Sequence, residues 1–85
     1  MTRRISASPL AYFLQQPTGV VVVSTRQRGC LFIEMDDDND YEVYGFSIDP
    51  LKFTSQYDVM NYCGDFTMIE TLNQETYEQK TVWSL

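Results

Sequence analysis

Four consecutive valines, Val20 to Val23, constrain the fold of this chain more than any other feature. Their β-branched side chains favour extended backbone because they fit a pleated, partly buried surface. An uninterrupted apolar run lacks the polar alternation of a strand with one face in water, so it indicates burial on both faces or an interface on one. A chain of 85 residues covers both faces of a strand only with difficulty. We therefore expect a homodimer, or a tight contact with another protein, through this strand or its neighbours.

Two more strands follow the valines, with tight turns between them. Residues 30–35 and 41–48 show the alternation of strands, and residues 26–29 and 36–40 are turns rich in polar residues. The alternating positions place Leu31, Ile33 and Met35 on one face, and Tyr44, Phe46 and Ile48 together on another. Short connections of this kind predict an antiparallel meander.

The N-terminal part predicts a short helix before the valines. Ser8 is a capping residue, Pro9 suits the first helical position, and Pro17 ends the run. Leu10, Phe13 and Leu14 form one apolar stripe at helical spacing. Residues 1–7 are expected to form a flexible basic arm.

A second helix is predicted near residue 60. Asp49 and Pro50 have the pattern of a capped helical turn, Ser55 with Asp58 repeats a capping box, and Gly64 fits the position after the helix end. Residues 65–72 have both strand-like and helix-like spacing, and their bracketing by Gly64 and Asn73 favours strand.

These elements together predict one α+β domain over residues 1–85. The expected architecture is a small antiparallel sheet of about five strands with two short helices on one face, in the order α-β-β-β-α-β-β. The last strand is expected within residues 76–85.

Charge is distributed very unevenly along the chain. The net charge is −6, from six basic and twelve acidic residues. Residues 1–33 contain four arginines and no acid, whereas residues 34–85 contain all twelve acids with only Lys52 and Lys80. Most aromatic residues lie in the acidic part, so direct binding of nucleic acid is not expected. An acidic surface instead attracts basic protein partners.

Several function classes are disfavoured by residue types that are scarce or absent. Histidine is absent, which removes the commonest general base and the commonest metal ligand. No glycine-rich phosphate loop is present, so neither an enzyme nor a cofactor is predicted. Cys30 and Cys63 lie in apolar sequence and are expected to be free thiols of a cytoplasmic protein. No stretch approaches the length of a membrane span.

The most unusual segment is residues 34–42, which contain six carboxylates. Asp36, Asp38 and Asp40 stand at alternate positions, as in a calcium loop. That loop requires glycine at its sixth position and glutamate at its twelfth, where this chain has Tyr41 and Ser47. No metal site is therefore predicted, and the segment is expected to form an exposed hairpin tip.

The acidic segment leads to a functional hypothesis. We predict a non-enzymatic protein-binding module, an acidic inhibitor or nucleic-acid mimic that acts on a basic protein or complex that handles nucleic acid, by analogy with accessory proteins of phages and mobile elements. Three alternatives stay open: a structural or regulatory subunit that assembles through the hydrophobic strand and an aromatic face, a small divalent-metal-binding domain, and an ordinary solvated turn. The predicted partner-binding residues are Glu34, Asp36, Asp37, Asp38, Asp40, Tyr41, Glu42 and Tyr44.

Overall fold

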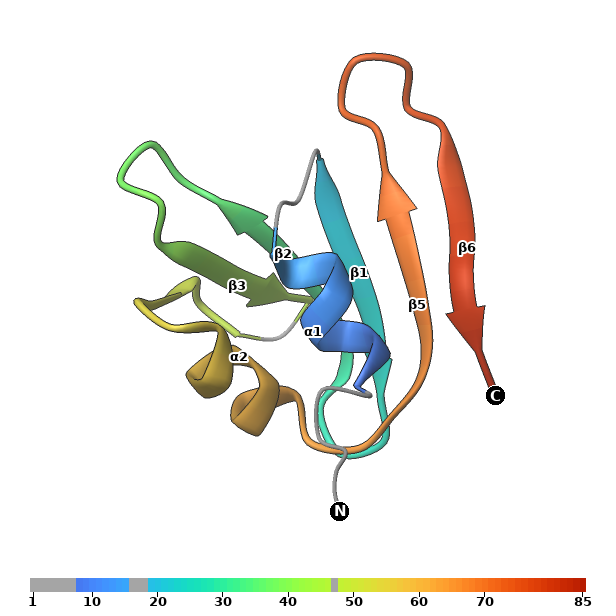
Figure 1. The fold of residues 1–85 in the computed structure, drawn as a ribbon, viewed down its shortest axis with the longest axis horizontal. Helices are drawn as coiled ribbons and strands as arrows, with labels where there is room; N and C mark the ends of the chain where they lie inside the picture. The colour runs from blue at the N-terminus through green and yellow to red at the C-terminus, as the bar shows by residue number, and fades with distance from the viewer. Residues whose placement is uncertain (1–7, 16–18, 47) are drawn as a thin grey trace.

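The computed structural model describes residues 8–15, 19–46 and 48–85, so the predicted arm at residues 1–7 lies outside the described residues. The chain forms a six-stranded antiparallel sheet in the order β4-β3-β2-β1-β5-β6, with two short helices on one face (Figure 1). The predicted fold class is confirmed, with one additional short strand. The elements are α1 (Pro9–Leu14), β1 (Val20–Thr25), β2 (Gly29–Met35), β3 (Tyr41–Gly45), β4 (Leu51–Phe53), α2 (Gln56–Cys63), β5 (Phe66–Leu72) and β6 (Gln79–Ser84).

The valine strand β1 lies at the centre of the sheet, paired with β2 on one edge and β5 on the other. Val21 and Val23 point to the helix side and belong to the core. Val20 and Val22 point to the opposite side, yet only 3% and 4% of their surfaces are exposed. Both faces of this strand are therefore buried within one chain, which confirms one of the two alternatives that its apolar run predicted. The expected homodimer or tight contact with another protein stays a prediction.

The core lies between the sheet and the two helices. Leu10 and Leu14 of α1 and Val59 and Cys63 of α2 are fully covered. The Ser55 hydroxyl accepts a hydrogen bond from the Asp58 N–H at 3.1 Å, which confirms the predicted cap of α2. Gly64 follows with a φ of 63°, a left-handed conformation that favours glycine. The predicted side-chain cap of α1 was wrong, because the Ser8 hydroxyl makes no capping hydrogen bond.

The segment after β3 differs from its prediction. The third strand ends at Gly45 rather than at residue 48, and Ile48 packs against the core. The helical turn expected at Asp49 and Pro50 does not form, because Leu51–Phe53 pairs with β3 as an edge strand. Pairing satisfies the backbone groups of β3 that would otherwise face water, and this outweighs the local capping pattern.

The C-terminal third confirms the preference for strand. Residues 66–72 form β5, which pairs with β1 and β6. Ile69 is fully buried on the helix side, and Trp83 of β6 packs beside it against the core. The polar link between the two strands closes as a turn in which the Asn73 side-chain oxygen accepts hydrogen bonds from the N–H groups of Glu75 and Thr76.

Candidate functional site

The acidic segment forms the turn that joins β2 to β3, as predicted. The Asp36 N–H donates to the Asp40 carbonyl at 2.8 Å, which closes the hairpin. Asn39 adopts a φ of 66°, which asparagine tolerates better than most residues. The Asp36 carboxylate accepts hydrogen bonds from the N–H groups of Asp38 and Asp40, at 2.9 and 3.0 Å. Asp36 therefore holds the turn in shape through its own side chain.

Asp36 also pairs with a lysine from the next strand. Its second carboxylate oxygen lies 3.0 Å from the Lys52 ammonium of β4. The hydrogen bond to Lys52, followed by that from the Asp40 N–H, lowers the pKa of Asp36, and the same pair raises the pKa of Lys52. Both carboxylate oxygens of Asp36 therefore have partners within the fold, which distinguishes Asp36 from the other acids of the turn.

The carboxylates of the other three acids of the turn make no hydrogen bond or ion pair among the described residues. Asp37 and Asp38 are exposed and Asp40 is half-buried. Within the described part of the chain, Asp36 is the residue of this turn whose carboxylate takes part in hydrogen bonds and an ion pair. We call Asp37, Asp38 and Asp40 the tip acids. They carry negative charge that the turn does not use for its own closure.

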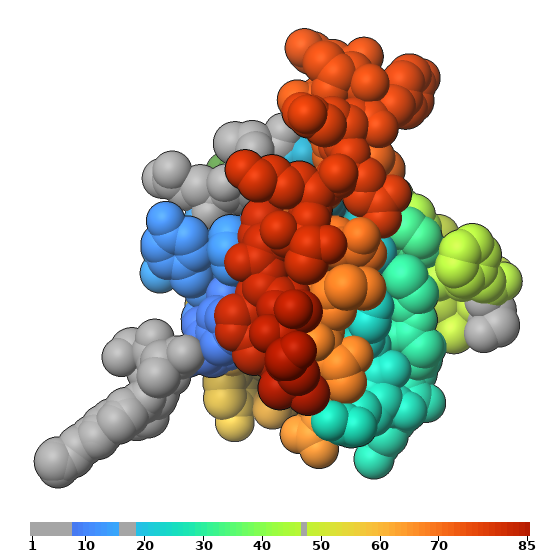
Figure 2. Space-filling view, turned by 90° about the vertical axis from the view of Figure 1, so that its right-hand side faces the viewer, coloured from blue at the N-terminus to red at the C-terminus, as the bar shows by residue number. Residues whose placement is uncertain are grey.

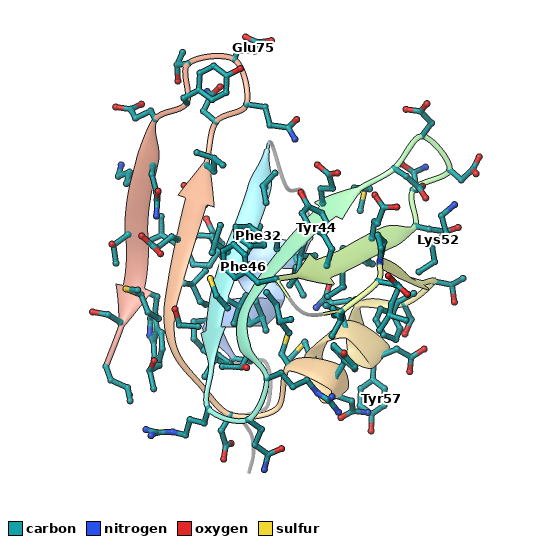
Figure 3. All side chains as sticks on the ribbon, turned by 180° about the vertical axis from the view of Figure 1, so that it is seen from behind. Phe32, Tyr44, Phe46, Lys52, Tyr57 and Glu75 are labelled. Carbon is teal, nitrogen blue, oxygen red and sulfur yellow. The ribbon has the colours of Figure 1, made fainter. Side chains whose placement is uncertain are left out.

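Glu34, Glu42 and Tyr44 alternate with the core residues Ile33 and Val43, so they lie on the face of the sheet away from the helices, which we call the open face. Tyr44 is labelled on this face in Figure 3. Glu34 pairs directly with Glu42 across β2 and β3, and Phe32 pairs with Tyr44 one step further along. An aromatic pair therefore adjoins a pair of like charges. Burial, followed by the negative charges of Glu34 and Glu42, raises the pKa of Tyr44.

A second hairpin tip lies at the same end of the sheet. The β5–β6 turn, residues 73–78, stands out above the body of the molecule (Figure 2). Its Gln74 side-chain amide donates to the Glu34 carboxylate at 2.8 Å, so this turn reaches across the end of β1 to β2. Glu75 and Glu78 are exposed in it. The two turns together place six of the twelve acids at one end of the sheet.

The opposite end of the sheet carries two arginines. Arg26 and Arg28 are exposed in the β1–β2 turn, which lies at the other end of β2 from the tip acids (Figure 1). The Arg28 guanidinium donates to the Tyr62 carbonyl at 2.8 Å and lies 4.0 Å from the centre of the Tyr62 ring. It therefore ties this turn to the end of α2. Asp65 also lies at this end, since its carbonyl accepts a hydrogen bond from the Arg26 N–H at 2.9 Å, so the separation of charge along the sequence is kept only in part in space.

The metal hypothesis has a specific geometric basis in the turn. Carboxylate oxygens of Asp36, Asp38 and Asp40 lie within 4.8 Å of one another. However, both oxygens of Asp36 are already used, one by backbone N–H groups and one by Lys52. A divalent ion at these oxygens would compete with the Lys52 ammonium for Asp36.

Tyr41 does not lie where a partner-binding anchor was expected. It is 6% exposed on the helix side of the sheet, and its hydroxyl donates to the Leu14 carbonyl at 2.6 Å. It therefore joins β3 to α1. The other seven predicted residues lie in the β2–β3 hairpin with partly or fully exposed side chains.

Two aromatic residues of this surface were not among the predicted partner-binding residues, although Phe46 had been placed on the same face as Tyr44. Phe32 stacks on Tyr44 with ring centres 5.5 Å apart and planes 17° apart. Phe46 meets Phe32 edge-on at 5.5 Å and is 87% exposed. Strict alternation from Glu34 back to Phe32 would have placed Phe32 on the open face.

Comparison with known protein families, curated proteins and solved structures found no match to this chain, so its function is inferred from the residues of this surface. Neither helix of the described part has the length of a membrane span, since the longer has eight residues. Cys30 and Cys63 are both free thiols, the first half-buried and the second buried.

Proposed function

We propose that this chain is a non-enzymatic binding module whose acidic hairpin end engages a basic protein that handles nucleic acid. The basic site of that partner normally receives phosphates. A row of carboxylates on a protein surface can occupy such a site because, like nucleic acid, it displaces the anions that are bound to the basic partner. The module would act by competition for that site.

The observation that carries this proposal is the placement of the tip acids. Asp37 and Asp38 are exposed, and the fold does not use them to close the turn, whereas Asp36 serves that purpose. Like charges held this close repel one another, which opposes folding. Their concentration at one end, away from Arg26 and Arg28, gives the molecule a directional field that orients a basic partner during encounter.

The proposed partner is a protein rather than nucleic acid because of the sign of this field. Glu75 and Glu78 of the second tip extend the negative end. Phosphates would be repelled from both tips, and the arginines that could attract them lie at the far end of the sheet. Exposed charges of this kind act mainly on the rate of association, and their effect on binding falls as the salt concentration rises.

The test is a triple variant, Asp37→Asn, Asp38→Asn and Asp40→Asn, measured against a labelled peptide rich in arginine and lysine at low salt. Asp36 stays unchanged so that the turn and its pair with Lys52 persist. Each exposed ion pair contributes roughly 0.2–1 kcal/mol. Loss of three such pairs is expected to weaken binding about tenfold, mainly through slower association.

A matched variant separates the located site from a general effect of net charge. Asp49→Asn, Asp58→Asn and Asp65→Asn removes the same charge from three exposed acids outside both tips. This variant is expected to bind nearly as well as the unchanged chain. Equal weakening by the two triple variants, or no weakening by the tip variant, would contradict the proposed site. Circular dichroism and urea unfolding confirm that both variants fold.

A further inference from the structure

The open face carries an arrangement that the acidic tip alone does not explain. Phe32 and Glu34 alternate on β2, and Tyr44 and Glu42 alternate on β3, so all four side chains share this face. The register pairs Phe32 with Tyr44 and Glu34 with Glu42. A stacked aromatic pair therefore lies directly beside a pair of carboxylates. We call these four residues the aromatic–acid block.

The block continues into an exposed ring. Phe46 follows Tyr44 along the chain, contacts the Phe32 ring edge-on and is 87% exposed. Figure 3 shows Phe32, Tyr44 and Phe46 together on the side of the sheet away from α2. Among the described residues, no helix lies over this face. A large exposed aromatic residue that contacts a stacked pair is typical of an interaction surface rather than of a core.

The like-charged pair indicates the chemistry of the occupant. Two carboxylates directly opposite on neighbouring strands repel one another and oppose folding. The Glu34 carboxylate accepts one hydrogen bond from Gln74. Lys52 of β4 lies opposite Glu42 in the register, but its ammonium forms its ion pair with Asp36. A cation bound between Glu34 and Glu42 would relieve this repulsion. The block thus has the charge and the flat apolar surface to accept a planar cation.

We infer that the aromatic–acid block and Phe46 form a docking site for arginine side chains of the basic partner. This inference rests on the proposed function and specifies the partner as arginine-rich. A guanidinium is flat, weakly hydrated and able to bind a carboxylate through two N–H groups while it stacks on an aromatic ring. A lysine ammonium is a strongly hydrated point charge that gains less from the rings.

A second copy of this chain fits the surface poorly. The open face carries Glu34, Glu42 and Glu70, and these would meet the same acids of the other copy in a symmetric pair. Opposed acids across an interface are unfavourable. Charge complementarity therefore selects a basic partner over self-association at this face.

The test compares two labelled peptides of equal length and charge, one with arginine and glycine and one with lysine and glycine. Binding of each to the full chain is measured by fluorescence anisotropy at low salt. Because a guanidinium stacks on an aromatic ring better than an ammonium does, the arginine peptide is expected to bind about tenfold more tightly.

Variants at Phe46 locate the origin of that preference. Phe46→Ala removes the exposed ring, and Phe46→Leu keeps apolar surface but removes the aromatic face. Both are expected to reduce the preference for arginine to about twofold or less. Tyr57→Ala, which removes a 71% exposed aromatic residue from α2, is the control and should leave the preference unchanged. The tip variant should weaken both peptides alike and keep their ratio.

The possible failures are distinct. Equal binding of the two peptides, with weakening of both by the tip variant, would overturn the arginine site and leave the proposed function standing. Retention of the preference in Phe46→Leu would overturn stacking at this residue. Binding of neither peptide would overturn both the arginine site and the proposed function.

Discussion

Ile33→Ala is expected to lower the free energy of unfolding by about 2–5 kcal/mol, the usual cost of a cavity in a packed core. Ile33 is fully buried on the helix side of β2, opposite Val21 of β1 and Val43 of β3. Its neighbours on both strands are held by the sheet, which limits how far the site can collapse around a cavity. In a domain of this size that loss is a large fraction of the total stability.

Urea unfolding of the unchanged protein and of the Ile33→Ala variant measures this difference in the free energy of unfolding. Leu51→Ala supplies the control, because Leu51 lies on the edge strand β4 and is 37% exposed. It is expected to cost clearly less than Ile33→Ala, since part of the Leu51 side chain stays in water and the residue lies outside the core cluster. A similar small loss for Ile33→Ala would show that the sheet does not place this residue in the core.

The stability of the chain is expected to fall by about 2 kcal/mol between pH 8 and pH 11 through Cys63 alone. This thiol is buried in α2, and burial raises its pKa from 9.0 to about 11, although the charge of Arg28 acts in the opposite direction. In the unfolded chain the thiol ionises near pH 9. The folded state then binds more protons than the unfolded state, so stability is complete below pH 9 and is lost as pH rises toward 11.

The Cys63→Ala variant isolates this contribution. Other groups titrate in the same range, including Tyr41, whose pKa is also raised by burial. The loss of unfolding free energy from pH 8 to pH 11 is therefore compared between the unchanged protein and Cys63→Ala. The difference is the contribution of the Cys63 thiol. Parallel curves for the two chains would mean that Cys63 is accessible to water in the folded state.

The sequence predicted the meander well because its signals are local. Alternation in residues 30–35, the turn chemistry of residues 36–40 and the cap at Ser55 act within a few positions of one another. β4 was not predictable in this way. Three residues are too few to show a period, and Leu51–Phe53 becomes a strand only because β3 offers an unpaired edge.

The valine strand shows a different limit. Its continuous apolar run correctly indicated burial on both faces, but the source of the cover on Val20 and Val22 was assigned to another chain. The register places Val22 between Phe32 of β2 and Glu70 of β5, and Val20 beside Leu72. Such cover comes from residues distant in sequence. The original reason for predicting a homodimer therefore no longer applies, and the oligomeric state stays a prediction.

The sequence predicted where the acidic residues of the candidate surface lie, but it did not predict which of their side chains are exposed and which have partners within the fold. The exposed tip followed from turn-forming residues. The role of Asp36 in closing the turn and its pairing with Lys52 depended on β4, which was missed. Tyr41 was assigned to the surface by its acidic neighbours, although alternation with Val43 places it on the buried side.

The most direct test of the central claim is a map of where a basic partner contacts the folded chain. Isotopically labelled protein is titrated with the arginine-rich peptide, and the backbone amide signals are followed by NMR. The largest changes are expected at the tip acids and at Glu34, Glu42, Tyr44 and Phe46. Changes confined to α2, or spread equally over Asp49, Asp58 and Asp65, would contradict the claim that the acidic hairpin and the adjoining open face form the binding surface.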